Sequence, residues 1–164
     1  IVFGSGGSRQ VEKGYSKSRA EQEFIDILKM MGPLANKHSV TVVVEPINSE
    51  ECNIINSVTE GAEAVRATSH PNVKLLADLY HMLRENENPD AIIKAGNLIR
   101  HVHVAEAANR TPPGVCGDDF RPFLSSLKKI SYQGDFSIES RWEDLLRQVG
   151  PAVTELEYQL LDVN

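Results

Sequence analysis

Four residues with metal-binding side chains stand at the ends of four predicted strands. They are Glu45, Asp78, His103 and Glu139, three carboxylates and one imidazole. Any one of them alone is typical of a structural or solvated residue. The carboxyl ends of parallel strands, however, meet at one edge of a sheet or one end of a barrel. Such ligands suit Mn²⁺, Mg²⁺ or Co²⁺ better than a metal that prefers thiolates, so the pattern predicts one shared divalent-metal site.

The chemistry that such a site could support is proton transfer at a carbon beside a carbonyl group. A metal that binds the carbonyl and a neighbouring hydroxyl of a hydroxyketone stabilises the enediolate. A positioned base adds roughly 10²- to 10⁴-fold to the rate. Epimerisation requires that the proton leave one face of the carbon and return to the other. Two carboxylates on opposite sides of the carbon can perform these two transfers.

The segment before Glu45 must be a buried strand if it is to position that carboxylate. Residues 39–44 are mostly valine and other β-branched residues. Such a run is typical of a strand that is buried on both faces in a parallel sheet. Pro46 follows Glu45 and ends the strand, because proline cannot donate a hydrogen bond to a neighbour.

Predicted strands and helices alternate along the chain. The strands cover residues 1–3, 39–44, 73–78, 98–106 and 136–139. The helices cover residues 18–38, 54–65, 88–96, 118–130 and 145–160. Five strand–helix units predict an α/β fold with parallel strands and right-handed crossovers.

Several local sequence signals predict where these helices begin, bend or are preceded by a turn. Ser18 and Glu21 form a predicted capping box for the first helix. Pro33 and Pro151 fall inside predicted helices, so a kink or a restart is expected at each. The glycine-rich residues 4–9 predict a turn between a strand and a helix. A phosphate cradle is the alternative, but no Gly-Lys-Ser/Thr sequence follows.

Composition limits the class of protein. The length of 164 residues fits one domain or part of a larger one. A net charge of −6 argues against a nucleic-acid partner, and no apolar stretch is long enough to span a membrane. Cys52 and Cys116 lack metal-ligand spacing and predict free thiols in a reducing cytoplasm. The chain opens inside a strand-like run at Ile1, so we expect preceding residues to be missing.

Five short motifs resemble those of the xylose-isomerase-like TIM-barrel superfamily of sugar phosphate isomerases and epimerases. The branch that they resemble most is the ketose 3-epimerases, of the D-tagatose and D-psicose 3-epimerase type. The motifs lie at residues 45–48, 51–53, 78–82, 101–106 and 138–140. The resemblance implies a (β/α) TIM barrel in which residues 1–164 form a single, partial domain. It would be the C-terminal five βα units of an eight-unit barrel.

The resemblance also implies roles for individual residues. The predicted metal ligands would bind Mn²⁺, with Co²⁺ or Mg²⁺ as alternatives, and Glu45 and Glu139 would also be the acid/base pair. His81, Glu51 and Glu106 would lie on the substrate side.

Arg110 would grip the substrate, although it lies one position beyond the family's arginine. Asn109 holds that position here, as if one residue had been inserted.

The expected function is therefore that of a metal-dependent sugar epimerase or isomerase. Its substrate would be a ketose or related polyol, and its mechanism proton abstraction. An inosose-type dehydratase, an apurinic-endonuclease-type phosphodiesterase and a truncated non-catalytic module are alternatives. Five strands leave two unpaired sheet edges and, we expect, an uncovered inner face, which together predict a homo-oligomer.

The sequence leaves alternative roles for two aromatic residues. His101 fits a core histidine better than a metal ligand. Trp142 could be a sugar-stacking face or simple packing.

Overall fold

A computed structural model describes residues 1–163 as an α/β protein with one parallel sheet. The sheet contains β1 (Val2–Phe3), β2 (Val42–Val44), β3 (Val73–Asp78), β4 (Ile99–Val104) and β5 (Phe136–Ile138). The strands lie side by side in chain order, and every neighbouring pair is parallel. This order is that of successive βα units in a TIM barrel, so the sheet is a partial barrel.

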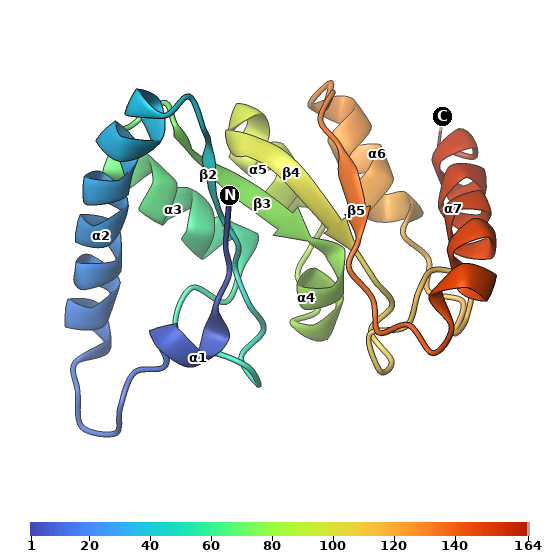
Figure 1. Ribbon diagram of the computed structural model, residues 1–164, viewed down its shortest axis with the longest axis horizontal. Coiled ribbons are helices and arrows are strands. Elements are labelled where there is room, and N and C mark those ends of the chain that lie inside the picture. The colour runs from blue at the N-terminus through green and yellow to red at the C-terminus, as the bar shows by residue number, and fades with distance from the viewer. Residues whose placement is uncertain (164) are drawn as a thin grey trace.

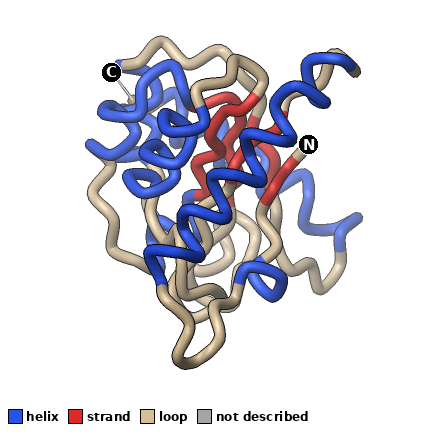
Figure 2. Tube along the Cα trace, turned by 90° about the vertical axis from the view of Figure 1, so that its left-hand side faces the viewer, coloured by secondary structure: helices blue, strands red, loops and turns tan. Residues whose placement is uncertain are grey.

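The helices lie along the outer side of the curved sheet (Figure 1). α2 and α7 stand at its two ends, and Figure 2 shows the helices around the strands from the side. The helices are α1 (Gly6–Arg9), α2 (Lys17–Lys37), α3 (Val58–Thr68), α4 (Leu79–Arg84), α5 (Asp90–Ala95), the 3-10 helix η1 (Gly96–Leu98), α6 (Arg121–Lys129) and α7 (Leu145–Leu161).

The hydrophobic core lies between the strands and the helices. Val44, Leu75 and Val102 point outward from the sheet into this core and are fully buried. All three residues of β2 are buried, which confirms the prediction of a buried strand, but the strand begins at Val42 and not at residue 39, where Ser39 has a positive φ of 54°. Val43 and Leu76 point to the inner side of the sheet and are also buried. The expectation of an uncovered apolar inner face is therefore wrong for β2 and β3, whereas Val2 of β1, in register with Val43, is 43% exposed.

Neither internal proline breaks its helix. α2 runs through Pro33 and α7 runs through Pro151. In α2 the buried positions Leu28, Gly32 and Ala35 lie on one face on both sides of the proline. A Cβ on Gly32 would come 2.5 Å from Cγ of His70, so the helix packs closely at this point. Packing along a continuous face thus outweighs the hydrogen bond that the proline cannot donate.

Several helix boundaries differ from the predictions. α2 begins at Lys17 because Ser16, and not Ser18, accepts a hydrogen bond from the Arg19 N–H at 3.3 Å. α3 begins later than predicted because Ile55 adopts a positive φ of 56° and Ser57 caps the helix.

Two short helices had not been predicted. α1 falls within the glycine-rich turn after β1, and α4 follows β3 without a loop. Each places residues beside the strand ends, so both bear on the candidate site.

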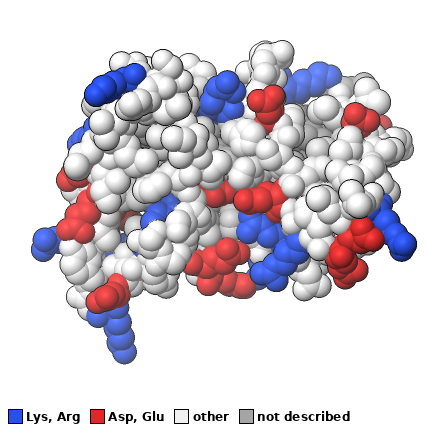
Figure 3. Space-filling view, viewed as in Figure 1, with Lys and Arg blue, Asp and Glu red and all other residues white. Residues whose placement is uncertain are grey.

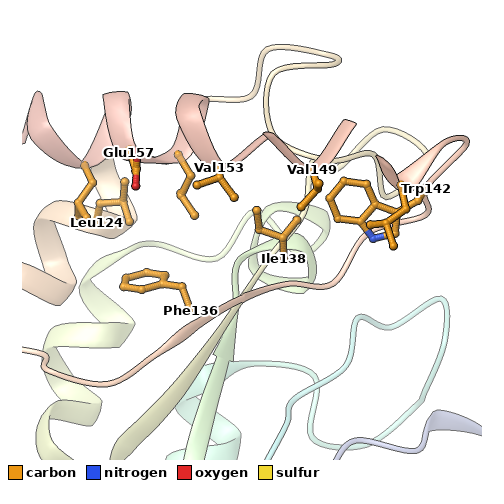
Figure 4. A pocket seen from close by; sticks show the side chains of 10 residues that line it. Leu124, Phe136, Ile138, Trp142, Val149, Val153 and Glu157 are labelled. Carbon is orange, nitrogen blue, oxygen red and sulfur yellow. The ribbon is translucent and has the colours of Figure 1, made fainter. Parts of the chain in front are cut away.

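Apolar grooves lie at both ends of the sheet. A groove of about 530 Å³ separates β5 from α7, and Figure 4 shows Phe136 and Ile138 facing α7 across it. Trp142 lines the same groove, which fits packing better than sugar stacking. A second cavity of about 570 Å³ lies beside β1 and α2, where Phe3 stacks on Phe24.

Two further expectations concern the whole chain. Within residues 1–163 no helix is both long and apolar enough to cross a membrane. Cys52 is buried, Cys116 is exposed, and both are free thiols.

Candidate active site

The four predicted ligands come together at the carboxyl ends of their strands. Asp78 is the last residue of β3, and it pairs in register with His103 of β4. Glu45 follows β2, and its N–H donates to the Phe3 carbonyl of β1 at 3.2 Å. Glu139 follows β5, and its N–H donates to the Val104 carbonyl at 3.1 Å. The ladders thus continue for one residue beyond β2 and β5 and hold both glutamates in register.

The ligand atoms of these residues lie within 4.8 Å of one another. Nδ1 of His103 is at the centre of the cluster. It lies 3.0 Å from Oε1 of Glu45, 3.3 Å from Oε2 of Glu139 and 3.8 Å from Oδ2 of Asp78. In the space-filling view, acidic side chains form a row across the middle of the molecule with basic side chains beside them (Figure 3).

The electrostatics of the cluster favour a bound cation. Burial, reinforced by the nearby Glu45 carboxylate, raises the pKa of Asp78 to about 7. Burial by itself lowers the pKa of His103, but hydrogen bonds to Glu139 and Glu45 outweigh it and raise that pKa to about 9. A proton on His103 therefore balances the carboxylates. A divalent cation such as Mn²⁺ could replace that proton, because three carboxylates and one neutral imidazole fit it as ligands.

His81 is placed beside the cluster by α4. The Asn48 N–H donates to Nδ1 of His81 at 3.1 Å. The proton of the neutral ring is therefore on Nε2, which lies 3.7 Å from Oδ2 of Asp78. Burial lowers the pKa of His81 to about 4. The ring is thus a neutral hydrogen-bond donor at the edge of the site.

Glu51 lies beside the same group of residues. Oε1 of Glu51 accepts hydrogen bonds from Nδ2 of Asn48 at 2.9 Å and from the Tyr80 hydroxyl at 3.2 Å. Burial raises the pKa of Glu51, but the Asn48 hydrogen bond and the charges nearby bring it below its usual value. Glu51 therefore remains a carboxylate next to His81.

Arg110 reaches the cluster despite its shifted position in the sequence. Its guanidinium donates to Oδ2 of Asp78 at 3.4 Å and forms a close ion pair with the Glu139 carboxylate. It lies over the Tyr80 ring, 4.7 Å from the centroid. Asn109 and Arg110 both have positive φ values, 57° and 56°. This left-handed pair bends the loop back toward the strand ends.

Glu106 does not face the cluster. Its side chain is fully buried, and its oxygens accept from the N–H groups of Gly114, Cys116, Gly117 and Asp118 and from the Thr111 hydroxyl. Burial raises its pKa, but these donors together lower it below the usual value. The geometry gives Glu106 the role of holding the Arg110 loop, in place of the substrate contact expected from the sequence.

His101 lies one strand repeat before His103, on the same face. Its Nε2 is 2.9 Å from the Ser137 hydroxyl, and its ring stands edge-on to His103 at 5.1 Å. It supplies none of the clustered ligand atoms. This agrees with the prediction of a satisfied core histidine.

Sequence reasoning gave no role to two residues beside the site. Asn48 fixes the His81 ring, and Tyr80 supports both Glu51 and Arg110. Asn48 was visible in the motif after Glu45, but its partners could not be derived. Tyr80 depends on α4, which the short apolar pattern after Asp78 did not reveal.

A parallel partial barrel whose strand ends carry a cluster of candidate metal ligands is typical of TIM-barrel proteins. Residues 1–160 match the family described as xylose isomerase-like TIM barrel, and the chain belongs to that family.

The relatives of this chain include sugar epimerases. It is 31% identical over 114 residues to L-ribulose 3-epimerase of Methylomonas sp. (strain DH-1), covering 69% of this chain and 40% of that protein. It superimposes with a TM-score of 0.83 on D-psicose 3-epimerase from Clostridium cellulolyticum H10, at 24% identity, covering 97% of this chain and 64% of that structure. The structure of the IOLI protein with a bound zinc atom also matches, with a TM-score of 0.75 at 21% identity. This match covers 94% of the present chain and 59% of the IOLI chain.

The chain is shorter than these relatives. It spans 40–44% of the length of the first three curated proteins that it matches. The activity of the whole protein is therefore a matter of proposal.

Proposed function

We propose that this protein is a divalent-metal-dependent sugar epimerase or isomerase that acts on a ketose or related polyol. The observation that carries the proposal is the convergence of Glu45, Asp78, His103 and Glu139 at four successive strand ends. Its relatives include L-ribulose and D-psicose 3-epimerases, which supports the sugar class. Mn²⁺ is the metal we propose, with Co²⁺ or Mg²⁺ as substitutes.

The clustered residues would have two roles in the proposed reaction, metal binding and proton transfer. A divalent cation held by the four ligands would supply positive charge beside the substrate oxygens on which negative charge develops. Glu45 and Glu139 come from strands that are separated by two others, so they can act from different sides of a bound carbon. One removes the proton and the other returns it. The group that removes the proton would act as a carboxylate, and the other would act as a carboxylic acid that donates a different proton to the opposite face and regains it from solvent between turnovers.

Three neighbouring side chains would bind and orient the substrate. His81 presents an Nε2–H, Glu51 accepts from a sugar hydroxyl, and the Arg110 guanidinium donates to substrate oxygens. Arg110 now binds Asp78 and Glu139. It would exchange part of this contact for the substrate, since a guanidinium carries five N–H donors.

The test of the reaction is isotope exchange with a free ketose in D₂O, carried out with the full-length protein. An epimerase incorporates deuterium at the carbon beside the carbonyl and returns that carbon inverted. A dehydratase yields a product that is lighter by one water. Mass spectrometry and NMR of the product separate these outcomes, and an absence of both deuterium and product contradicts an enzyme of either kind.

We also propose that residues 1–164 act as one domain in the cytoplasm and associate into a homo-oligomer, without a nucleic-acid or membrane partner. Within residues 1–163, β1 and β5 each pair on one side only. Apolar grooves lie beside both of these strands, and such edges favour association. Sedimentation of the 164-residue chain tests this. We expect a dimer or larger species with little activity, and a stable, active monomer contradicts it.

A further inference from the structure

We propose that residues 3–9, from the end of β1 through α1 (the β1–α1 segment), set the position of Glu45, with Gly4 and Arg9 as positioning residues. The inference rests on the proposed function, because it concerns how one of the proposed acid/base groups is held. Neither residue touches the reacting atoms.

Gly4 provides the space that the Glu45 carboxylate occupies. A Cβ at Gly4 would lie 1.5 Å from Oε2 and 2.7 Å from Cδ of Glu45. Gly4 is not among the glycines with positive φ, so its backbone would accept any residue. The requirement for glycine is therefore one of space. Oε1 of the same carboxylate contacts Nδ1 of His103, so Gly4 and His103 confine the group between them.

Arg9 holds the backbone of the same glutamate. It is the last residue of α1, its exposed fraction is 8%, and its Nη2 donates to the Glu45 carbonyl at 3.0 Å. The guanidinium lies 5.4 Å from the centroid of the Phe24 ring. Nε and Nη1 have no partner among the described residues. Burying an arginine with so few hydrogen bonds is costly, which points to a role beyond local stability.

The β1–α1 segment therefore contacts Glu45 at three points. Phe3 accepts from its N–H, Arg9 donates to its carbonyl, and Gly4 lies against its carboxylate. Pro46 follows, so no backbone N–H of the next residue can add to this support. The glycine-rich turn thus belongs to the site through Glu45 and needs no phosphate ligand to explain it.

The consequence for the site is specific. The atoms that a Gly4 methyl group would meet first are the far end of a flexible side chain. Gly4→Ala should therefore fold normally while it moves the Glu45 carboxylate. A shift of about 1 Å can reduce turnover by roughly 10²-fold. Loss of support for a ligand typically weakens metal affinity by about 10- to 100-fold.

The experiment measures Mn²⁺ affinity by isothermal titration calorimetry, with circular dichroism to check folding. Gly7→Ala is the matched control, because no atom lies within 4 Å of a Cβ at that glycine. We expect Gly4→Ala to weaken binding by at least about 10-fold and Gly7→Ala to leave it unchanged. Arg9→Met should also weaken binding, and Arg9→Lys, which keeps a donor and a charge, should restore part of it. Equal affinity in Gly4→Ala, Arg9→Met and the wild type overturns the inference.

A crystal structure of Gly4→Ala separates this inference from the proposed function. If the wild type binds no divalent metal, the proposed function fails, but the position of Glu45 can still be read. A Glu45 carboxylate displaced by about 1 Å or more supports the inference. A carboxylate in its original place overturns it. If Gly4→Ala does not fold, the same reading of Arg9→Met decides between these outcomes.

Discussion

The two proposed acid/base residues stand in contrasting surroundings. Glu45 follows β2, which pairs with strands on both sides, and 6% of its side chain is exposed. Glu139 follows β5, which pairs only with β4 among the described strands, and 49% of its side chain is exposed. His103 contacts both carboxylates, but backbone contacts and close packing also hold Glu45, whereas the charge of Arg110 also holds Glu139. The same chemical group is thus positioned by packing at one end of the site and by electrostatics at the other.

The largest expected effect is a loss of turnover that is equal for the two glutamates, despite their different surroundings. In an active form of the protein, Glu45→Gln and Glu139→Gln should each reduce turnover by roughly 10³-fold, because an amide can neither accept the proton nor supply ligand charge. Steady-state kinetics with a ketose substrate measures this. Glu143→Gln, an exposed neighbour of Glu139, should retain full turnover. Normal turnover in either Glu45→Gln or Glu139→Gln removes that residue from the mechanism.

The pH dependence of stability should identify the group between the two carboxylates. The folded pKa of His103, about 9, lies above its ordinary value of 6.5. Its stabilising contribution is therefore complete below pH 6.5 and is lost as pH rises to 9. Asp78, with a pKa of about 7, is already half titrated at pH 7, so most of the loss above pH 7 belongs to His103. Without metal, the free energy of unfolding should fall by up to roughly 3 kcal/mol.

Urea unfolding at pH 6, 7.5 and 9 in the presence of a chelator measures this loss. His103→Gln removes the titrating group and should make the stability nearly constant above pH 7. A wild-type protein whose stability rises between pH 7.5 and 9 contradicts the assignment.

A bound metal should hold both Glu45 and Glu139, and it should therefore stabilise the folded protein. Mn²⁺ at about 100 times its Kd should raise the free energy of unfolding by about 2.7 kcal/mol, because it binds only the folded state. Thermal unfolding with Mn²⁺ and then with excess chelator measures the gain and its reversal. Activity should disappear on chelation and return with Mn²⁺ or Co²⁺. Full activity after exhaustive chelation would contradict the proposal that the enzyme depends on a metal.

Much of the fold could be derived because the signals are local or repeat regularly. The valine run before Glu45 and the alternation of apolar strands with amphipathic helices give the parallel sheet. The four ligands could be named because each stands where its strand ends. Pro33 and Pro151 were misleading, because both helices run through their prolines, and in α2 the packing that outweighs the lost hydrogen bond is a tertiary effect that the sequence does not display.

The rest of the site depends on contacts between distant segments. Arg9 lies 36 residues from Glu45, and Asn48 lies 33 residues from His81. The role of Glu106 depends on a loop that folds back on its carboxylate, and no periodic pattern describes such a loop. Glu106 is charged and follows a strand, so its position in the sequence resembles that of a ligand. Only its complete burial reveals the structural role.

The smallest expected effect concerns the electrostatic end of the site. Arg110→Gln should lower the free energy of unfolding by only about 1 kcal/mol, because water screens its close pair with the half-exposed Glu139 and its contact with the buried Asp78 is long, at 3.4 Å. The loop itself should persist, since Glu106 binds its backbone independently of the arginine. KM for the sugar should rise much more than stability falls, because the guanidinium would contact the substrate. Arg141→Gln is the control, as it removes an exposed arginine close in sequence. Urea unfolding and steady-state kinetics on both variants decide the matter: a loss of several kcal/mol with an unchanged KM would make Arg110 a structural residue. Charge would then hold the β5 end as firmly as packing holds the β2 end.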